Sequence, residues 1–267
     1  YLFRLHDGEY IETVLIPEKK YYTLCISCQV GCAQGCKFCL TARGGFVRNL
    51  KLGEITGQVL HVKKALGAKK SLANIVFMGM GEPLANYENV INAANIITDG
   101  KYGMQFSNRK VTISTAGIVS KLSGLGQDTK VNLAVSLNAA DNDTRNKLMP
   151  VNNRYPLEKL IDECRKYSLA TRRKITFEYI LLKNINDSME DAKGLARLLG
   201  SIKAKVNLIP FNEYSRSNFA RPDESVIDMF CDILSKNGLA AMVRRSKGED
   251  ISAACGQLRV NTHGEAP

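Results

Sequence analysis

The stretch CAQGCKFC, residues 32–39, places Cys32, Cys36 and Cys39 in a CxxxCxxC spacing. Glycines at positions 31 and 35 let the chain turn sharply around these cysteines. Three thiolates at this spacing can hold one cubane iron–sulfur cluster, and the stretch supplies no fourth ligand in register. One iron then stays open for a small molecule. Radical enzymes use such an iron to bind the amino and carboxylate groups of S-adenosylmethionine (SAM) and to deliver an electron to its sulfonium.

A structural zinc site is the first alternative, because residues 25–28 and 36–39 form two CxxC pairs. Only seven residues separate the pairs, which is short for a four-cysteine zinc site, and Cys32 would stay unused. A disulfide framework is the second alternative. A chain of 267 residues with eight cysteines does not need such staples to hold a core. Clustered thiols favour metal ligands and redox partners in a reducing compartment, so we expect a cytoplasmic protein.

The composition is typical of a soluble globular protein of one large domain or two small ones, with 45% hydrophobic and 24% charged residues. The sequence contains no apolar run long enough to span a bilayer and no signal peptide, so we expect no membrane partner. The net charge of +11, with basic runs such as residues 172–174, indicates a polyanionic partner, nucleic acid first. A basic surface that only solubilises the protein is the alternative.

Apolar runs alternate with amphipathic stretches, which predicts alternating strands and helices. The expected strands are residues 12–16, 22–26, 73–78, 110–114, 131–137, 174–181, 204–209 and 241–245. The expected helices lie near residues 53–66, 87–97, 141–147, 156–168, 187–200 and 223–236. The succession of strand, helix and strand at spacings near 30–40 residues favours parallel strands with right-handed crossovers, in an α/β sheet or partial barrel. We expect the chemistry at the carboxyl ends of the strands.

The stretch MGMGEPL, residues 78–84, follows one of the expected strands. Two glycines allow a hard turn, Glu82 adds a carboxylate and Pro83 fixes the exit. Neither GxGxxG nor GK[ST] is present, so a phosphate loop is not indicated. We expect a cradle for an ammonium group such as that of methionine, with a plain turn as the alternative.

Ordered strings along nearly the whole chain resemble one family, the RlmN-type radical SAM methyltransferases that modify adenine in 23S rRNA and tRNA. The strings are ETVLIP (12–17), LCISCQVGCAQGCKFC (24–39), GFVRNL (45–50), MGMGEPL (78–84), TISTAG (112–117), KLMPVNNRYP (147–156), EYILL (178–182), NLIPFN (207–212) and DISAACGQL (250–258). The resemblance implies a partial (β/α)6 TIM-like barrel of the radical SAM type in residues 25–267. It also implies a short N-terminal strand extension, residues 1–24. Because the chain begins at Tyr1, we expect a helical accessory domain to precede it.

Site residues carry over from the resemblance position by position. They are Cys32, Cys36 and Cys39 as 4Fe-4S ligands; Gly81, Glu82, Ser114, Ser136, Leu137, Asn138 and Asn212 as SAM contacts; Cys255 as the methyl-carrying cysteine; Cys25 as the resolving cysteine; and Glu12 as the general base. The chain departs from the family in reading SLN where SLH is usual, so Asn138 cannot titrate. It also has Cys28 where serine is common, and we assign Cys28 no role.

The chemistry of adenine explains why a cluster, two further cysteines and a base are needed. Carbon 2 has no lone pair with which to attack the methyl group of SAM, so a radical must be added to it. A thiolate is the side chain that accepts a methyl group most readily, which suits Cys255. A second SAM, cleaved at the cluster, gives a radical that takes hydrogen from the S-methyl group. The adduct then loses a proton to Glu12 and is released by Cys25, which leaves a disulfide for an outside donor to reduce.

The resemblance implies further partners and leaves alternatives open. It implies two SAM per turnover, 23S rRNA and tRNA as substrates, an external electron donor of the flavodoxin type, and a monomer. A carbon 8 methyltransferase of the same family, the Cfr type, would keep every one of these cysteines, although the proline of MGMGEPL favours the carbon 2 type by resemblance. An iron–sulfur or zinc RNA-binding module without catalysis would need neither Cys255 nor Glu12.

Overall fold

An eight-stranded sheet forms the centre of the computed structural model, which describes residues 1–67, 71–167, 173–214 and 217–244. Its order is β12-β11-β10-β9-β8-β7-β4-β3, and all neighbours are parallel except β3 with β4. The strands are β3 (Val14–Pro17), β4 (Tyr22–Cys25), β7 (Leu72–Phe77), β8 (Val111–Thr115), β9 (Asn132–Ser136), β10 (Ile175–Leu181), β11 (Ala204–Pro210) and β12 (Ala240–Val243). The predicted α/β partial barrel is confirmed.

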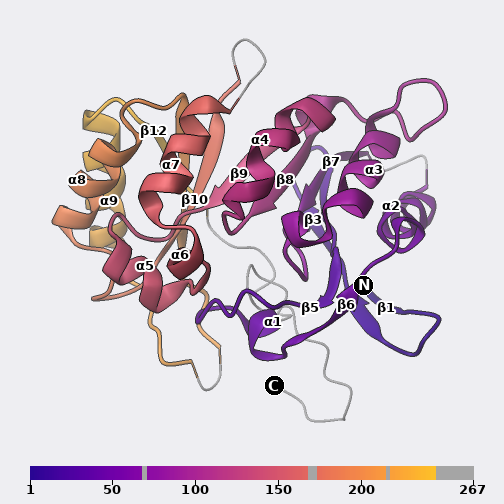
Figure 1. The fold of residues 1–267 in the computed structure, drawn as a ribbon, viewed down its shortest axis with the longest axis horizontal. Coiled ribbons are helices and arrows are strands. Elements are labelled where there is room, and N and C mark those ends of the chain that lie inside the picture. Colours follow the sequence, from indigo (N-terminus) through magenta and orange to yellow (C-terminus); the bar gives the residue numbers. More distant parts are fainter. Residues whose placement is uncertain (68–70, 168–172, 215–216, 245–267) are drawn as a thin grey trace.

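Helices cover the outside of the curled sheet, as Figure 1 shows. The longer ones are α2 (Leu52–Leu66), α3 (Tyr87–Thr98), α4 (Val119–Asp128), α7 (Leu157–Lys166), α8 (Met189–Leu199) and α9 (Glu224–Lys236). The shorter ones are α1 (Leu40–Arg43), α5 (Asn142–Leu148), α6 (Val151–Arg154) and the 3-10 turns η1 (Pro83–Asn86) and η2 (Asn108–Lys110). Two small antiparallel sheets pair β1 (Leu2–Arg4) with β2 (Tyr10–Glu12) and β5 (Gln29–Gly31) with β6 (Phe46–Asn49).

The expected strand over residues 12–16 is divided in two, because β2 ends at Glu12 and β3 begins at Val14. Thr13, between them, is fully buried, and its hydroxyl donates to Gln58 Oε1 at 2.6 Å. The Ser27 hydroxyl donates to the Glu12 carbonyl. These bonds anchor the junction between the two strands, where β2 pairs with β1 and β3 pairs with β4 in the main sheet.

Two apolar clusters support the fold. The larger fills the space between the sheet and its helices with side chains such as Val59, Phe77 and Phe230. The smaller includes Phe38 and Met149, and Cys36 and Cys39 pack against it. The cysteine stretch therefore packs against hydrophobic side chains.

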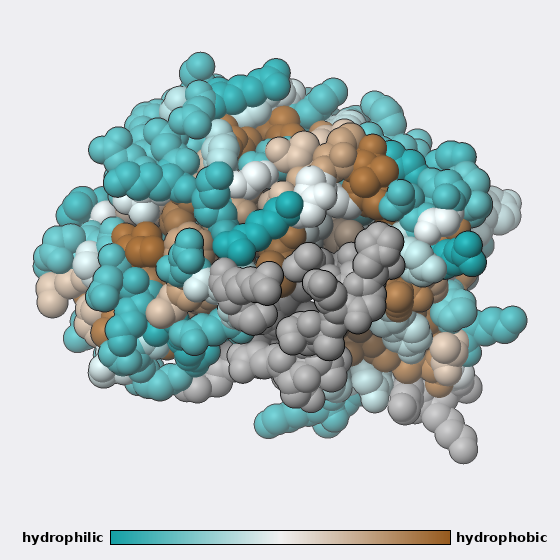
Figure 2. Space-filling model, turned by 90° about the horizontal axis from the view of Figure 1, so that it is seen from below, coloured by the Kyte–Doolittle hydropathy of each residue, from teal (hydrophilic) through white to brown (hydrophobic). Residues whose placement is uncertain are grey.

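The surface seen from the side of α1, β5 and β6 has hydrophilic side chains around its rim and hydrophobic ones between them, as Figure 2 shows. Within the described residues, no helix combines the length and apolar composition that a membrane crossing requires.

Candidate active site

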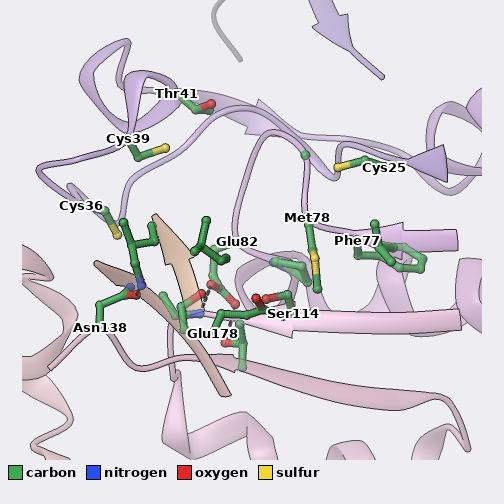
Figure 3. Close-up of a pocket in the computed structure, with 18 of the residues that line it drawn as sticks. Cys25, Cys36, Cys39, Thr41, Phe77, Met78, Glu82, Ser114, Asn138 and Glu178 are labelled. Atoms are coloured by element: carbon green, nitrogen blue, oxygen red, sulfur yellow. Dashed lines mark hydrogen bonds between the residues drawn. The ribbon is translucent and has the colours of Figure 1, made fainter. Parts of the chain in front are cut away.

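One pocket of about 400 Å³ opens at the carboxyl ends of the strands. This volume is in the range of small-molecule sites. Most of the predicted site residues line it: Cys25, Cys32, Cys36, Cys39, Gly81, Glu82, Ser114, Ser136 and Asn138. Figure 3 shows Cys36 and Cys39 at one end of the pocket, with Cys25 well apart from them. The fold thus gathers residues that lie more than a hundred positions apart in the sequence.

Backbone hydrogen bonds fix the cysteine stretch on two sides. The Cys32 N–H donates to the Gly45 carbonyl at 2.7 Å, and the Lys37 N–H donates to the Leu148 carbonyl at 3.0 Å. Gly31 has a φ of +72°, and a side chain there would overlap the Gly45 carbonyl. Glycine is therefore required where the stretch leaves β5. The stretch is held by β6 and by the end of α5.

The three cysteines of the stretch fit the donor set of a 4Fe-4S cluster. Burial raises the pKa of Cys32 to about 12 and also raises that of Cys36, and nearby Cys39 contributes to both shifts. Thiolate ligands are stabilised by the positive charge of iron, which reverses such an effect. Each thiolate of a cubane binds a different iron, so the three sulfurs need not meet at one point.

A zinc site built from the two CxxC pairs does not match this geometry, because Cys25 lies apart from Cys36 and Cys39 in Figure 3. Among the residues that the structure describes, no three His, Cys, Asp or Glu side chains are placed to hold a single metal ion. Cys28 is buried beside Glu82 and Cys32, and its N–H donates to the Met80 carbonyl at 2.8 Å.

Glu82 is buried at the turn after β7 and joins that turn to β8. Its Oε1 accepts from Leu84 N–H at 3.0 Å and from the Thr115 hydroxyl at 2.7 Å, and its Oε2 accepts from Ala116 N–H at 2.7 Å. Burial raises the pKa of Glu82, and these three donors oppose that shift. A carboxylate has about four acceptor sites. One acceptor site on Oε2 is therefore left, and the ammonium cradle stays a prediction.

Gly81 makes this turn possible. Its φ is +103°, and a Cβ would come within 2.6 Å of the Gln29 Cβ. The Gln29 side chain in turn accepts from the Glu82 N–H at 2.8 Å. Close approach of two chain segments is thus the physical reason for the glycine.

Asn138 has a left-handed backbone with a φ of +59°, a conformation that asparagine tolerates better than most residues. Its Oδ1 accepts from Ile180 N–H at 2.8 Å, and its Nδ2 donates to Met149 Sδ at 3.2 Å. The side chain that replaces the family's usual histidine therefore ties β9 to β10 beside the pocket. Leu137 is fully buried outside the lining, and its N–H donates to the Glu178 carbonyl.

Three described residues of the predicted set lie outside the pocket lining, namely Leu137, Asn212 and Glu12. Asn212 is buried just after β11 and Glu12 is half-buried at the end of β2, but neither is among the lining residues. The Glu12 N–H contacts Met80 Sδ at 3.4 Å, next to the Gly81 turn. Cys255 lies outside the described residues.

Sequence reasoning missed Glu178, a carboxylate of β10 that lines the pocket and is 5% exposed. Its Oε1 accepts from Asn207 Nδ2 at 3.0 Å, while its Oε2 is buried with no hydrogen-bond partner among the described residues. Burial raises the pKa of Glu178, and the positive charge of Arg244 opposes this. The only signal in the sequence was a charged residue inside an apolar strand, which gives no hint of an unpaired oxygen.

Comparisons with known proteins show the family to which the chain belongs. The family model of the Radical SAM superfamily matches residues 26–196. A dual-specificity RNA methyltransferase RlmN from Desulfosudis oleivorans is 61% identical over 258 residues, covering 97% of this chain and 70% of the relative. The chain belongs to the RlmN family. Another RlmN, from Syntrophobacter fumaroxidans, is 54% identical and covers 97% of this chain and 75% of the relative.

A solved structure also resembles this chain over nearly its whole length. The crystal structure of a radical SAM methyltransferase from Sphaerobacter thermophilus matches with a TM-score of 0.93 and 47% identity, over 97% of this chain and 76% of that one. Membership of the RlmN family confirms the predicted radical SAM enzyme class and its cofactors, a 4Fe-4S cluster and SAM.

Proposed function

We propose that this RlmN-family enzyme methylates carbon 2 of adenosine in 23S rRNA and tRNA through a methyl group carried on Cys255. The names of its relatives support RNA as the substrate. The observation that carries the proposal is the shared pocket of Cys25, the three cysteines of residues 32–39 and Glu82. A thiol that takes no part in cluster binding thus faces the space where SAM would lie.

When bound, the cluster and SAM supply the methyl group and a carbon radical. We assign Cys32, Cys36 and Cys39 to the cluster. The free acceptor site of Glu82 suits the ammonium of SAM, and the Ser114 and Ser136 hydroxyls offer further polar contacts in the same pocket.

Glu178 adds a contact that the resemblance did not include. Its buried Oε2 needs a hydrogen-bond donor, and the pocket is the direction from which a ligand can supply one. The ribose hydroxyls of SAM are donors of that kind. Residue roles in product release follow the family: Cys25 attacks the Cys255 sulfur, and Glu12 accepts the proton from carbon 2. Glu12 as the base rests on the resemblance.

Basic side chains near the cysteine stretch suit a phosphate backbone. Lys37 and Arg43 are exposed on the stretch and on α1, and Lys147 and Arg154 are exposed on α5 and α6. The net charge of +11 acts in the same direction. An adenine must leave its stack to enter a pocket of this size, so unpaired adenines are the expected targets. An external reductant of the flavodoxin type and a monomeric state are part of the same proposal.

The test is product analysis with purified, anaerobically reconstituted protein, SAM, reductant and either 23S rRNA fragments or tRNA. We expect 2-methyladenosine on nucleoside mass spectrometry and an S-methyl group on the Cys255 peptide. Cys255→Ala should form no product, whereas Cys231→Ala, which changes a cysteine on α9, should remain active. A product methylated at carbon 8 would assign the chain to the Cfr type, and unmodified RNA would contradict the proposal.

A further inference from the structure

Arg145 on α5 is fully buried, and within the described part of the chain its guanidinium donates only to uncharged acceptors. It reaches the Leu137 carbonyl at 3.0 Å, the Ala116 carbonyl at 2.8 Å, the Ser136 carbonyl at 3.1 Å and Asn152 Oδ1 at 2.9 Å. No carboxylate among the described residues forms an ion pair with it. Buried charges are normally paired, so this cation requires an explanation.

The arginine keeps its charge despite its position. Burial lowers the pKa of Arg145 to about 10, which is still well above neutral pH. Four hydrogen bonds hold the guanidinium in place, so the side chain cannot turn to solvent. The protein therefore maintains a fixed positive charge in an interior of low dielectric.

This charge lies near Cys36, one of the predicted cluster ligands. Ala116 and Ser136, whose carbonyls it binds, line the pocket. The helix that carries it ends at Leu148, which accepts the backbone bond from Lys37 in the cysteine stretch. Burial raises the pKa of Cys36, and the positive charge of Arg145 opposes that shift.

We propose that Arg145 is the counter-charge of the iron–sulfur cluster and raises its reduction potential, an inference that rests on Cys32, Cys36 and Cys39 as the ligands. Three thiolates carry more negative charge than the iron–sulfide core neutralises, and reduction by an external one-electron donor adds more. A fixed cation nearby favours the more negative state. Arg145 touches no reacting atom and is a positioning residue.

A purely structural role would be to tie the carbonyls of Ala116 and Ser136 together, and three variants separate the two roles. Arg145→Met removes both the charge and the hydrogen bonds. Arg145→Lys keeps the charge but loses most of the bonds. Asn152→Asp keeps an oxygen acceptor for the arginine and places a negative charge next to it, at the loss of the amide donor to Asn142 and Asn146. Asn237→Asp, at the exposed end of α9, is the matched control for adding a charge.

The measurement is a mediated redox titration of each reconstituted protein, followed by electron paramagnetic resonance of the reduced cluster. We expect the midpoint potential to become more negative in Arg145→Met and Asn152→Asp, and to stay near the wild-type value in Arg145→Lys and Asn237→Asp. If Arg145→Met does not assemble a cluster, the Asn152→Asp result alone decides.

An unchanged potential in Asn152→Asp, or equal shifts in Arg145→Met and Arg145→Lys, would overturn the proposal. Failure of the ligand assignment is a separate outcome, since Cys36→Ala protein would then still give the 4Fe-4S signal in the same titration.

Discussion

The Thr115 hydroxyl donates to Glu82 Oε1 at 2.7 Å, which joins the end of β8 to the turn after β7. The same hydroxyl oxygen accepts from the Gly117 N–H at 3.0 Å. Thr115 is 1% exposed, so both bonds are shielded from water. One side chain therefore sets the relative position of two strand ends that we assign to SAM binding.

Thr115→Val should weaken both the fold and SAM binding, because it keeps the shape and removes the donor to a buried carboxylate. We expect the free energy of unfolding to fall by about 1–3 kcal/mol. SAM affinity, measured by equilibrium dialysis, should fall by roughly tenfold, equivalent to about 1.4 kcal/mol. Thr112→Val, on the same strand, is the control and should change neither quantity. Equal effects of the two variants would contradict the assigned role of the hydroxyl.

Gly81→Ala should destabilise the protein by about 1–3 kcal/mol, because its φ is positive and the new Cβ would overlap Gln29. Gly57→Ala is the comparison variant, and we expect it to change the free energy of unfolding in the opposite direction. Gly57 lies inside α2 with open space around it, so alanine there should stabilise the helix by up to about 1 kcal/mol. Urea unfolding measures both changes, and a stable Gly81→Ala protein would count against the required close approach.

The stability of the cofactor-free protein should depend on pH through Glu178. Burial raises the pKa of Glu178 above its ordinary value of 4.5, so the folded state holds this proton more tightly than the unfolded chain does. The protonated carboxyl therefore contributes its full share to the free energy of unfolding below pH 4.5. This contribution is lost as the pH rises through the pKa of Glu178 in the folded state. Glu178→Gln removes this loss. Wild-type stability, measured by urea unfolding, should therefore fall with rising pH more steeply than that of the variant.

Glu190→Gln on the exposed start of α8 is the control for the pH experiment and should follow the wild-type curve. Parallel curves for wild type and Glu178→Gln would show that the carboxyl does not change its proton affinity on folding.

Cys25→Ala should trap the enzyme on its RNA. Without the attacking thiol, methylation of Cys255 and addition to adenine should proceed, and only release should fail. A denaturing gel should then show protein cross-linked to RNA through Cys255, located by mass spectrometry. The double variant Cys25→Ala/Cys255→Ala should give no cross-link. Normal turnover by Cys25→Ala, or attachment at any other residue, would refute the assigned roles.

Replacing Lys37 and Arg43 by glutamine should weaken RNA binding mainly at low salt. If each neutralises one phosphate, the slope of log affinity against log salt should become less steep by roughly 1.4–1.8 units, from about 0.7–0.9 per phosphate. Arg165→Gln, at an exposed arginine of α7 paired with Asp162, is the control. An unchanged slope in the Lys37/Arg43 variant would remove these residues from the RNA-binding surface.

Much of the sheet could be predicted because its strands are short apolar runs followed by polar or glycine residues. The helix α4 was missed, since its sequence VSKLSGLGQD contains two glycines that lower helix propensity. The structure explains one of them: a Cβ at Gly124 would come within 3.1 Å of the Tyr87 hydroxyl. Tertiary packing of this kind leaves no local signal in the sequence.

Site residues could be predicted where the residue type itself indicates the chemistry. They could not be predicted where the chemistry depends on the surroundings of the side chain in the fold. The three cysteines and Glu82 could be chosen from their strings. Glu178 and Arg145 could not, because a carboxylate in a strand and an arginine in a helix are usually exposed. Only the fold reveals that one has an unpaired oxygen and the other no ionised partner.

The two edges of the main sheet, β3 and β12, both reach the pocket, since Val14 and Ile16 line it from one side and Met242 and Val243 from the other. In a closed barrel, hydrogen bonds between the first and the last strand would fix the diameter of the barrel. Among the described residues these edges are not paired with each other, so a change in the coiling of the sheet breaks no backbone hydrogen bond between them. The width of the pocket between these edges is therefore set by the packing of side chains and helices and not by backbone hydrogen bonds from edge to edge.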